Sequence, residues 1–164
     1  MQYRSFARVA GVAILSVAVS AWGYATVGDN AEHAAHVEAA PANTMTVFKD
    51  PNCGCCKEWI THLRKHGFTV IARDTSDMGG IKATARVPRQ LYSCHTGFIN
   101  GYVVEGHVPA ADIQRMLKDK PKIAGIAVAG MPAGSPGMEV PGRVDRYDVV
   151  AYARDGSTSV FARH

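Results

Sequence analysis

Residues 45–67, MTVFKDPNCGCCKEWITHLRKHG, decide how this chain begins to fold. The apolar run 45–48 is typical of a short strand, and residues 50–52 favour a turn directly after it. A helix is predicted next and is expected to end at Gly67. Its apolar positions follow the i, i+3, i+4, i+7 pattern of an amphipathic helix: Cys56, Trp59, Ile60 and Leu63. The clustered cysteines therefore lie on a turn between a strand and a helix.

The rest of the chain continues this alternation of strands and helices. Asn100 and Gly101 favour a tight hairpin turn, and Pro109 suits the first turn of a helix that ends before Pro121. The order predicts an α/β, thioredoxin-like domain with a mixed sheet flanked by helices, plus a C-terminal β-hairpin extension. The expected elements are a strand at 68–72, a helical stretch ending before Pro88, hairpin strands at 97–99 and 102–104, a helix carrying Ile113, Met116 and Leu117, an apolar run at 123–128, a loop at 130–142, and a last hairpin of 148–153 and 159–162.

The first 44 residues differ in composition from the remainder. Arg4 and Arg8 precede the apolar run 9–21 and small residues follow, so residues 1–25 are predicted to be a signal peptide. The alanine-rich residues 26–44 are predicted to be a flexible linker, and 45–164 the thioredoxin-like metal-binding domain. This organisation predicts a periplasmic protein. If the signal remained uncleaved, it would serve as the membrane anchor.

The charge balance excludes one large class of partners. The chain carries a net charge of +4, which falls to +2 without the signal arginines Arg4 and Arg8. It has no lysine-rich run and no basic residues interleaved with aromatic ones, which a nucleic-acid-binding surface would need. We therefore expect no nucleic-acid partner.

Cys53, Cys55 and Cys56 are too close together to act as a disulfide framework, which stabilises a fold most when it closes long loops. Thiolates form readily at a helix N-terminus, where the helix dipole and free N–H groups favour negative charge. Copper(I) is the soft cation that thiolates prefer, and each sulfur can bridge two metal ions. The cluster therefore predicts a copper(I) site, a redox site, or both.

Two alternatives to copper remain open. Cys53 and Cys56 have the spacing of a thioredoxin redox centre, which would make the protein a periplasmic thiol-disulfide oxidoreductase. A structural zinc site formed by all four cysteines is the other alternative. The adjacent positions of Cys55 and Cys56 disfavour it, because tetrahedral coordination of one ion would be strained.

Five further side chains are candidate metal ligands. Cys94, the fourth cysteine, lies in the polar stretch Ser-Cys-His-Thr before the first hairpin. A lone cysteine is more often a buried thiol, but a loop at this place can reach the cysteine turn. The nitrogen candidates are His95 and His107, which could instead order their loops through hydrogen bonds, and the thioether candidates are Met131 and Met138, which could instead fill the core.

Four segments resemble the CopG-type periplasmic copper-resistance proteins, a family first described as a domain of unknown function with predicted metal binding. They are Cys-Gly-Cys-Cys at 53–56, Ser-Cys-His-Thr at 93–96, Gly-Tyr-Val-Val-Glu-Gly-His-Val-Pro-Ala at 101–110 and Gly-Met-Pro-Ala-Gly-Ser-Pro-Gly-Met-Glu at 130–139. The resemblance covers Met45 to about Ala153. It implies a thioredoxin-like fold and a multinuclear copper(I)–thiolate site formed by the cysteine turn and Cys94.

The function expected from these observations is copper resistance through sequestration of copper(I). Its enzymatic form would be a copper-linked oxidoreductase, in which the bound copper changes oxidation state. The expected partners are copper ions and other periplasmic copper-handling proteins.

Overall fold

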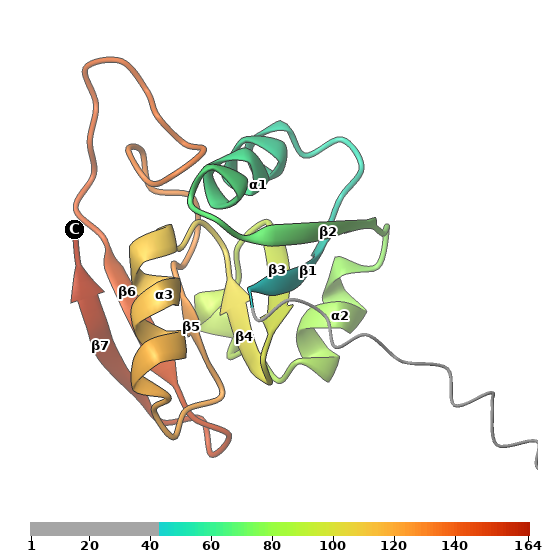
Figure 1. The fold of residues 1–164 in the computed structure, drawn as a ribbon, viewed down its shortest axis with the longest axis vertical. Helices are drawn as coiled ribbons and strands as arrows, with labels where there is room; N and C mark the ends of the chain where they lie inside the picture. The colour runs from blue at the N-terminus through green and yellow to red at the C-terminus, as the bar shows by residue number, and fades with distance from the viewer. Residues whose placement is uncertain (1–42) are drawn as a thin grey trace, which may run out of the picture. The chain divides into compact units, whose positions relative to one another are not determined.

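A seven-stranded sheet forms the centre of residues 43–164, the part of the chain that the computed structural model describes (Figure 1). The strand order is β2-β1-β3-β4-β5-β6-β7. The elements are β1 (Thr44–Lys49), α1 (Gly54–Lys65), β2 (Thr69–Asp74), α2 (Met78–Thr84), the 3₁₀ helix η1 (Arg89–Leu91), β3 (His95–Ile99), β4 (Tyr102–Glu105), α3 (Ala110–Asp119), β5 (Gly125–Ala127), β6 (Asp148–Tyr152) and β7 (Thr158–Arg163).

The sheet is mixed, as the sequence predicts. β1 pairs with β2 and β4 with β5 in parallel, and the remaining neighbours are antiparallel. The elements from β1 to α3 appear in the order expected for a thioredoxin-like domain. The predicted signal peptide and nearly all of the predicted linker, residues 1–42, lie outside the described residues. Within 43–164, no helix has the length and apolar character needed to cross a membrane.

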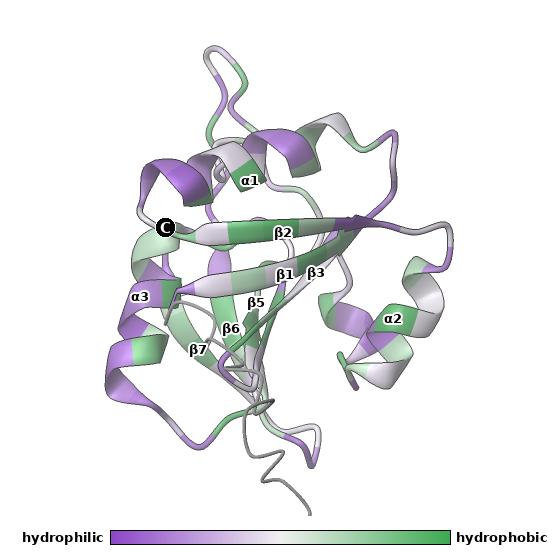
Figure 2. Cartoon of the chain, turned by 45° about the vertical axis from the view of Figure 1, so that its right-hand side comes forward, coloured by the Kyte–Doolittle hydropathy of each residue, from purple (hydrophilic) through white to green (hydrophobic). Residues whose placement is uncertain are grey.

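One face of the sheet is covered by α1 and α3, which carry most of their hydrophilic residues on the side turned away from it (Figure 2). Trp59 and Leu63 of α1 and Ile113 of α3 are completely buried in this core. The i, i+4 spacing of Trp59 and Leu63 places both on one side of α1. Apolar burial on this side therefore fixes α1, and with it the cysteine turn that begins the helix.

The opposite face carries a smaller core next to α2 and η1. Val103 lies in this smaller core, whereas its neighbour Val104 lies in the main one, as expected from the alternation of side chains along a strand. Val87 and Leu91 cover Val103 and Tyr152 on this face. The residues that follow, 92–94, lead from this layer back to the cysteine turn.

The hairpins form where the sequence predicts them. Asn100 and Gly101 both have positive φ, 47° and 82°, as a two-residue hairpin turn requires. The strands β6 and β7 extend the sheet at one edge and confirm the predicted C-terminal hairpin. The long segment between β5 and β6 packs near the cysteine turn, since Gly137 lies against the first turn of α1.

Candidate metal centre

The N-terminus of α1 holds three of the four cysteines. Cys53 is the N-cap, and its Sγ accepts a hydrogen bond from the Cys56 N–H at 3.3 Å. The structure also joins Cys53 to Cys56 in a disulfide, with their Cα atoms 5.4 Å apart. One helical turn separates the two residues, which places their Cα atoms within the range that a disulfide spans. All four sulfurs are therefore available to a metal only after this bond is reduced.

Cys94 meets the other three cysteines in space. Its Sγ lies 3.8 Å from Cys55 Sγ, which in turn lies 3.5 Å from Cys53 Sγ. The four Sγ atoms all lie within 4.8 Å of one another. Cys94 follows Cys55 by 39 positions, and it reaches the turn because β3 pairs directly with β1. The arrangement can bind a soft metal, as the sequence predicts.

The thiol of Cys94 keeps its proton at neutral pH. Burial raises its pKa to about 11, and the neighbouring Cys55 contributes in the same direction. A metal ion that binds Cys94 must therefore displace this proton, since only the thiolate is a strong ligand. Metal binding at this position is coupled to proton release.

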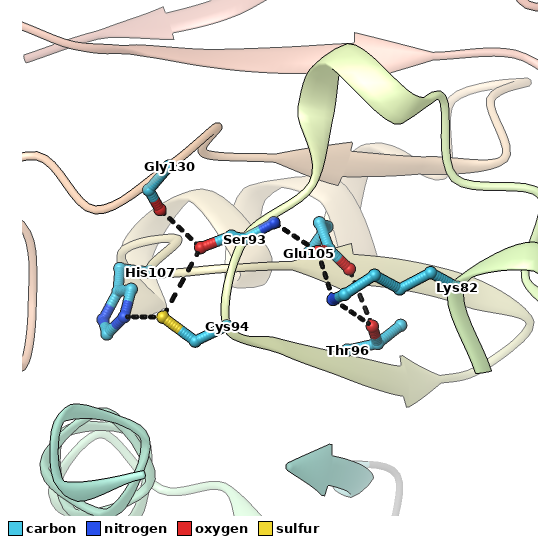
Figure 3. A network of polar contacts seen from close by, with 7 residues as sticks. All are labelled: Lys82, Ser93, Cys94, Thr96, Glu105, His107 and Gly130. Carbon is cyan, nitrogen blue, oxygen red and sulfur yellow. Dashed lines mark hydrogen bonds and ion pairs between the residues drawn. The ribbon is translucent and has the colours of Figure 1, made fainter. Parts of the chain in front are cut away.

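His107 directs a ring nitrogen at Cys94 (Figure 3). Its Nδ1 lies 2.8 Å from the Pro136 carbonyl oxygen, and its Nε2 lies 3.4 Å from Cys94 Sγ. A carbonyl oxygen can only accept, so Nδ1 carries the proton and donates it. Burial lowers the pKa of the His107 imidazole, which favours the neutral ring. Nε2 then holds a lone pair at the cysteine cluster, the form in which histidine binds a metal.

His95 is completely buried, and within residues 43–164 neither of its ring nitrogens makes a hydrogen bond of good geometry. Its ring lies 4.2 Å from the Trp59 ring and 4.9 Å from the His107 ring, measured between centroids. Burial holds its pKa well below the usual value. Donor atoms of Cys94, His95 and His107 lie within 4.8 Å of one another. An unsatisfied buried imidazole is costly, and a metal ligand role would satisfy it.

The two methionine candidates occupy different surroundings. Met131 is 56% exposed at the rim of an open hollow of about 460 Å³ beside the cysteines. Met138 is half-buried and is not among the residues that line this hollow. The hollow is lined by Cys53, Cys55, Tyr92, Ser93, Cys94, Gly130 and Met131. Met131 therefore lines the same hollow as three of the cysteines.

Lys82 and Glu105 form a buried ion pair beneath the cysteine loop, which sequence analysis did not identify. Burial raises the pKa of Glu105, and the Lys82 ammonium opposes this effect. The available signal was the position of Glu105 at the end of an otherwise apolar strand, Tyr-Val-Val-Glu. Lys82 carried no signal, since a lysine in a short helix is usually exposed.

A family model described as "Protein of unknown function, DUF411" matches residues 91–138. No curated protein matches the chain. A solved structure described as copper resistance protein CopG, form 2, is 49% identical, with a TM-score of 0.71, over 74% of this chain and 97% of that one. A second, form 1, is 48% identical, with a TM-score of 0.72, over 76% of this chain and 98% of that one.

These identities extend over nearly the whole length of both solved chains and over most of this one. The family model covers the part of the chain that contains Cys94 and His107. The chain belongs to the CopG family of copper-resistance proteins.

Proposed function

We propose that this protein binds copper(I) in a multinuclear thiolate site and contributes to copper resistance by sequestering the metal in the periplasm. The observation that carries the proposal is the convergence of four cysteine sulfurs within 4.8 Å of one another. The signal-like residues 1–25 support a periplasmic location, and the two CopG structures support copper as the metal.

The donor set fits copper(I) better than a hard metal ion. Thiolate, thioether and imidazole donors select soft or borderline metals, and no carboxylate belongs to the two clusters of candidate ligands in residues 43–164. Several thiolates this close repel one another unless cations lie between them, and a sulfur can bridge two copper(I) ions. In this proposal Cys53, Cys55, Cys56 and Cys94 hold the metal.

The two histidines complete the donor set on the inner side. His107 offers Nε2 because its Nδ1 proton is bound to the Pro136 carbonyl. His95 offers a ring whose nitrogens make no hydrogen bond of good geometry within the described part of the chain. Met131, at the exposed rim, is the thioether donor best placed to contact incoming metal, and Met138 remains a second candidate.

The test is an anaerobic titration of the fully reduced, metal-free protein with copper(I). We expect more than one copper ion per chain. The same chain with the Cys53–Cys56 disulfide intact is the matched control and should bind fewer ions, since two ligands are blocked. Replacing Cys94 by Ser should lower the stoichiometry or affinity without unfolding the protein. Binding of no more than one ion by the reduced chain would reject a multinuclear site.

A second candidate function rests on the Cys53–Cys56 disulfide itself. The bond lies at the N-terminus of α1 beside an open hollow, which is the setting of a thiol-disulfide oxidoreductase. Catalysed insulin reduction by the metal-free protein, abolished in Cys56→Ser, would favour this function. Activity that depends on copper would favour a copper-linked oxidoreductase.

A further inference from the structure

The buried pair of Lys82 and Glu105 lies beside Ser93, the residue before Cys94 (Figure 3). Lys82 Nζ lies 2.5 Å from Glu105 Oε1, and the two side chains are only 5% and 0% exposed. Removing two charges from water is expensive, and an apolar pair of similar volume is often equally stable or more so. Stability alone therefore does not explain the pair.

The Glu105 carboxylate accepts hydrogen bonds from three donors, of which Lys82 is the first. Oε1 also accepts a hydrogen bond from the Ser93 backbone N–H at 2.7 Å, and Oε2 accepts one from Thr96 Oγ1, also at 2.7 Å. Lys82 Nζ donates a second bond to Thr96 Oγ1 at 3.1 Å. Of these partners, Ser93 lies outside any helix or strand. Glu105 thus connects the rigid sheet to the loop before β3.

Ser93 is held on three sides, and Cys94 is the next residue. Its N–H is bound to Glu105, and its Oγ donates to the Gly130 carbonyl oxygen at 2.5 Å. On the third side Gly106 packs so closely that a Cβ added to Gly106 would lie 2.6 Å from Ser93 Oγ. These contacts fix the backbone from which the Cys94 side chain projects.

One strand therefore controls two parts of the metal centre. β4 ends at Glu105, which holds Ser93, and two residues later His107 contacts Cys94 Sγ. Glu105 and His107 thus contact two consecutive residues of the loop, Ser93 and Cys94.

We propose that Glu105 is a positioning residue that holds the Ser93 amide and so sets Cys94 Sγ against Cys55 and His107. Lys82 neutralises the carboxylate and makes its burial tolerable. The effect of Glu105 on metal affinity rests on the proposed copper function. Its effect on the position of Cys94 can be tested without metal.

Two double variants separate the hydrogen bond from the charge. Lys82→Met with Glu105→Leu replaces the pair by apolar side chains and removes the acceptor for the Ser93 N–H. Lys82→Met with Glu105→Gln is equally uncharged but keeps a side-chain oxygen for that N–H and an amide donor for Thr96. Only the first variant should release the loop.

The metal-free readout is the alkylation rate of Cys94 divided by that of Cys55, followed by mass spectrometry. With the Cys53–Cys56 disulfide intact, these are the two free thiols of the chain. We expect the ratio to rise several-fold in the Leu variant, because the loop opens more often, and to stay at the wild-type value in the Gln variant. An unchanged ratio in a folded Leu variant would overturn the proposal.

The copper readout is the copper(I) affinity of the reduced proteins, measured by competition with a chelator. Loss of an outer contact to a ligand typically weakens metal binding about 10- to 100-fold, which we expect for the Leu variant and not for the Gln variant. If the wild-type protein binds no copper(I), the proposed copper function is wrong. The alkylation ratio of Cys94 to Cys55 still shows whether Glu105 positions Cys94, because it is measured without metal.

A third comparison covers the case in which the Leu variant does not fold. Ser93→Pro removes the same hydrogen bond from the donor side, and Tyr92 before it has φ −60° and ψ 139°, which proline tolerates in the preceding residue. Ser93→Ala keeps the N–H and is its control. A higher alkylation ratio in Ser93→Pro than in Ser93→Ala supports the proposal, and equal ratios reject it.

Discussion

Replacing Gly137 by Ala should weaken both the fold and the metal centre. Gly137 has φ +81°, and a Cβ at this residue would lie 2.7 Å from the backbone nitrogen of Trp59 and 2.8 Å from the carbonyl oxygen of Cys55. The segment carrying it therefore rests on the first turn of α1. Its neighbour Pro136 supplies the carbonyl that holds the His107 Nδ1 proton.

The magnitude has two parts. Holding a residue with a Cβ in the left-handed region costs roughly 1–2 kcal/mol. Forcing a methyl group into filled space typically costs about 1–3 kcal/mol more. Together they predict a loss of about 2–5 kcal/mol in the free energy of unfolding, unless the segment lifts off α1 to relieve the contact. Lifting would take the Pro136 carbonyl away from His107, which should lower copper(I) affinity about 10-fold or more.

The control is Gly142→Ala in the same segment. Gly142 has φ +74°, but a Cβ there meets nothing within 4 Å, so the substitution adds the backbone strain without the collision. Denaturant unfolding and chelator competition on both variants give the comparison. We expect Gly142→Ala to lose about 1–2 kcal/mol and no copper affinity. Equal losses of stability and affinity in the two variants would refute the reasoning.

Three further predictions concern single side chains. Trp59→Ala should lower the free energy of unfolding by about 3–5 kcal/mol, because the Trp59 side chain is completely buried and its Nε1–H donates a hydrogen bond to the Val108 carbonyl oxygen. A loss of less than about 1 kcal/mol in denaturant unfolding would contradict this. Copper(I) binding near neutral pH should release the proton of the Cys94 thiol, because the pKa of this thiol is raised to about 11. Calorimetry in buffers of different ionisation enthalpy counts the protons released, and Cys94→Ser should release one fewer than wild type. Burial holds the pKa of His95 well below its usual value of 6.5, so as pH falls the unfolded chain takes up a proton at this residue before the folded chain does. The free energy of unfolding of the metal-free protein should therefore fall as pH drops below about 6.5, and it should fall less in His95→Phe. Denaturant unfolding at several pH values measures this difference.

Local patterns predicted the helices α1, α2 and α3 and the strands, but not the short 3₁₀ helix η1. The apolar spacing of Trp59, Ile60 and Leu63 predicted α1, because a helix buries one side in any fold. Asn100 and Gly101 predicted the first hairpin, since few other residues adopt its turn. The strand boundaries differ from those predicted by at most two residues, as at β3, which begins at His95 rather than at Gly97.

The metal centre was predicted in part. Three sulfurs on one turn are local, so their proximity followed from the sequence directly. The approach of Cys94 was inferred from the expected order of elements and from the resemblance, and the structure confirms that it lies beside Cys55. The spacing of Cys53 and Cys56 indicated a redox pair as one alternative to a metal site, and the geometry at the start of α1 shows that these two cysteines form the disulfide.

The sequence by itself determined the elements, the cysteine turn and the identity of the candidate donors, because each depends on residues a few positions apart. Only the tertiary structure decided the tautomer of His107 and the pairing of Lys82 with Glu105. Each of these depends on atoms brought together by strand pairing and helix packing, whose positions are set by burial of the whole core and not by any local run of residues.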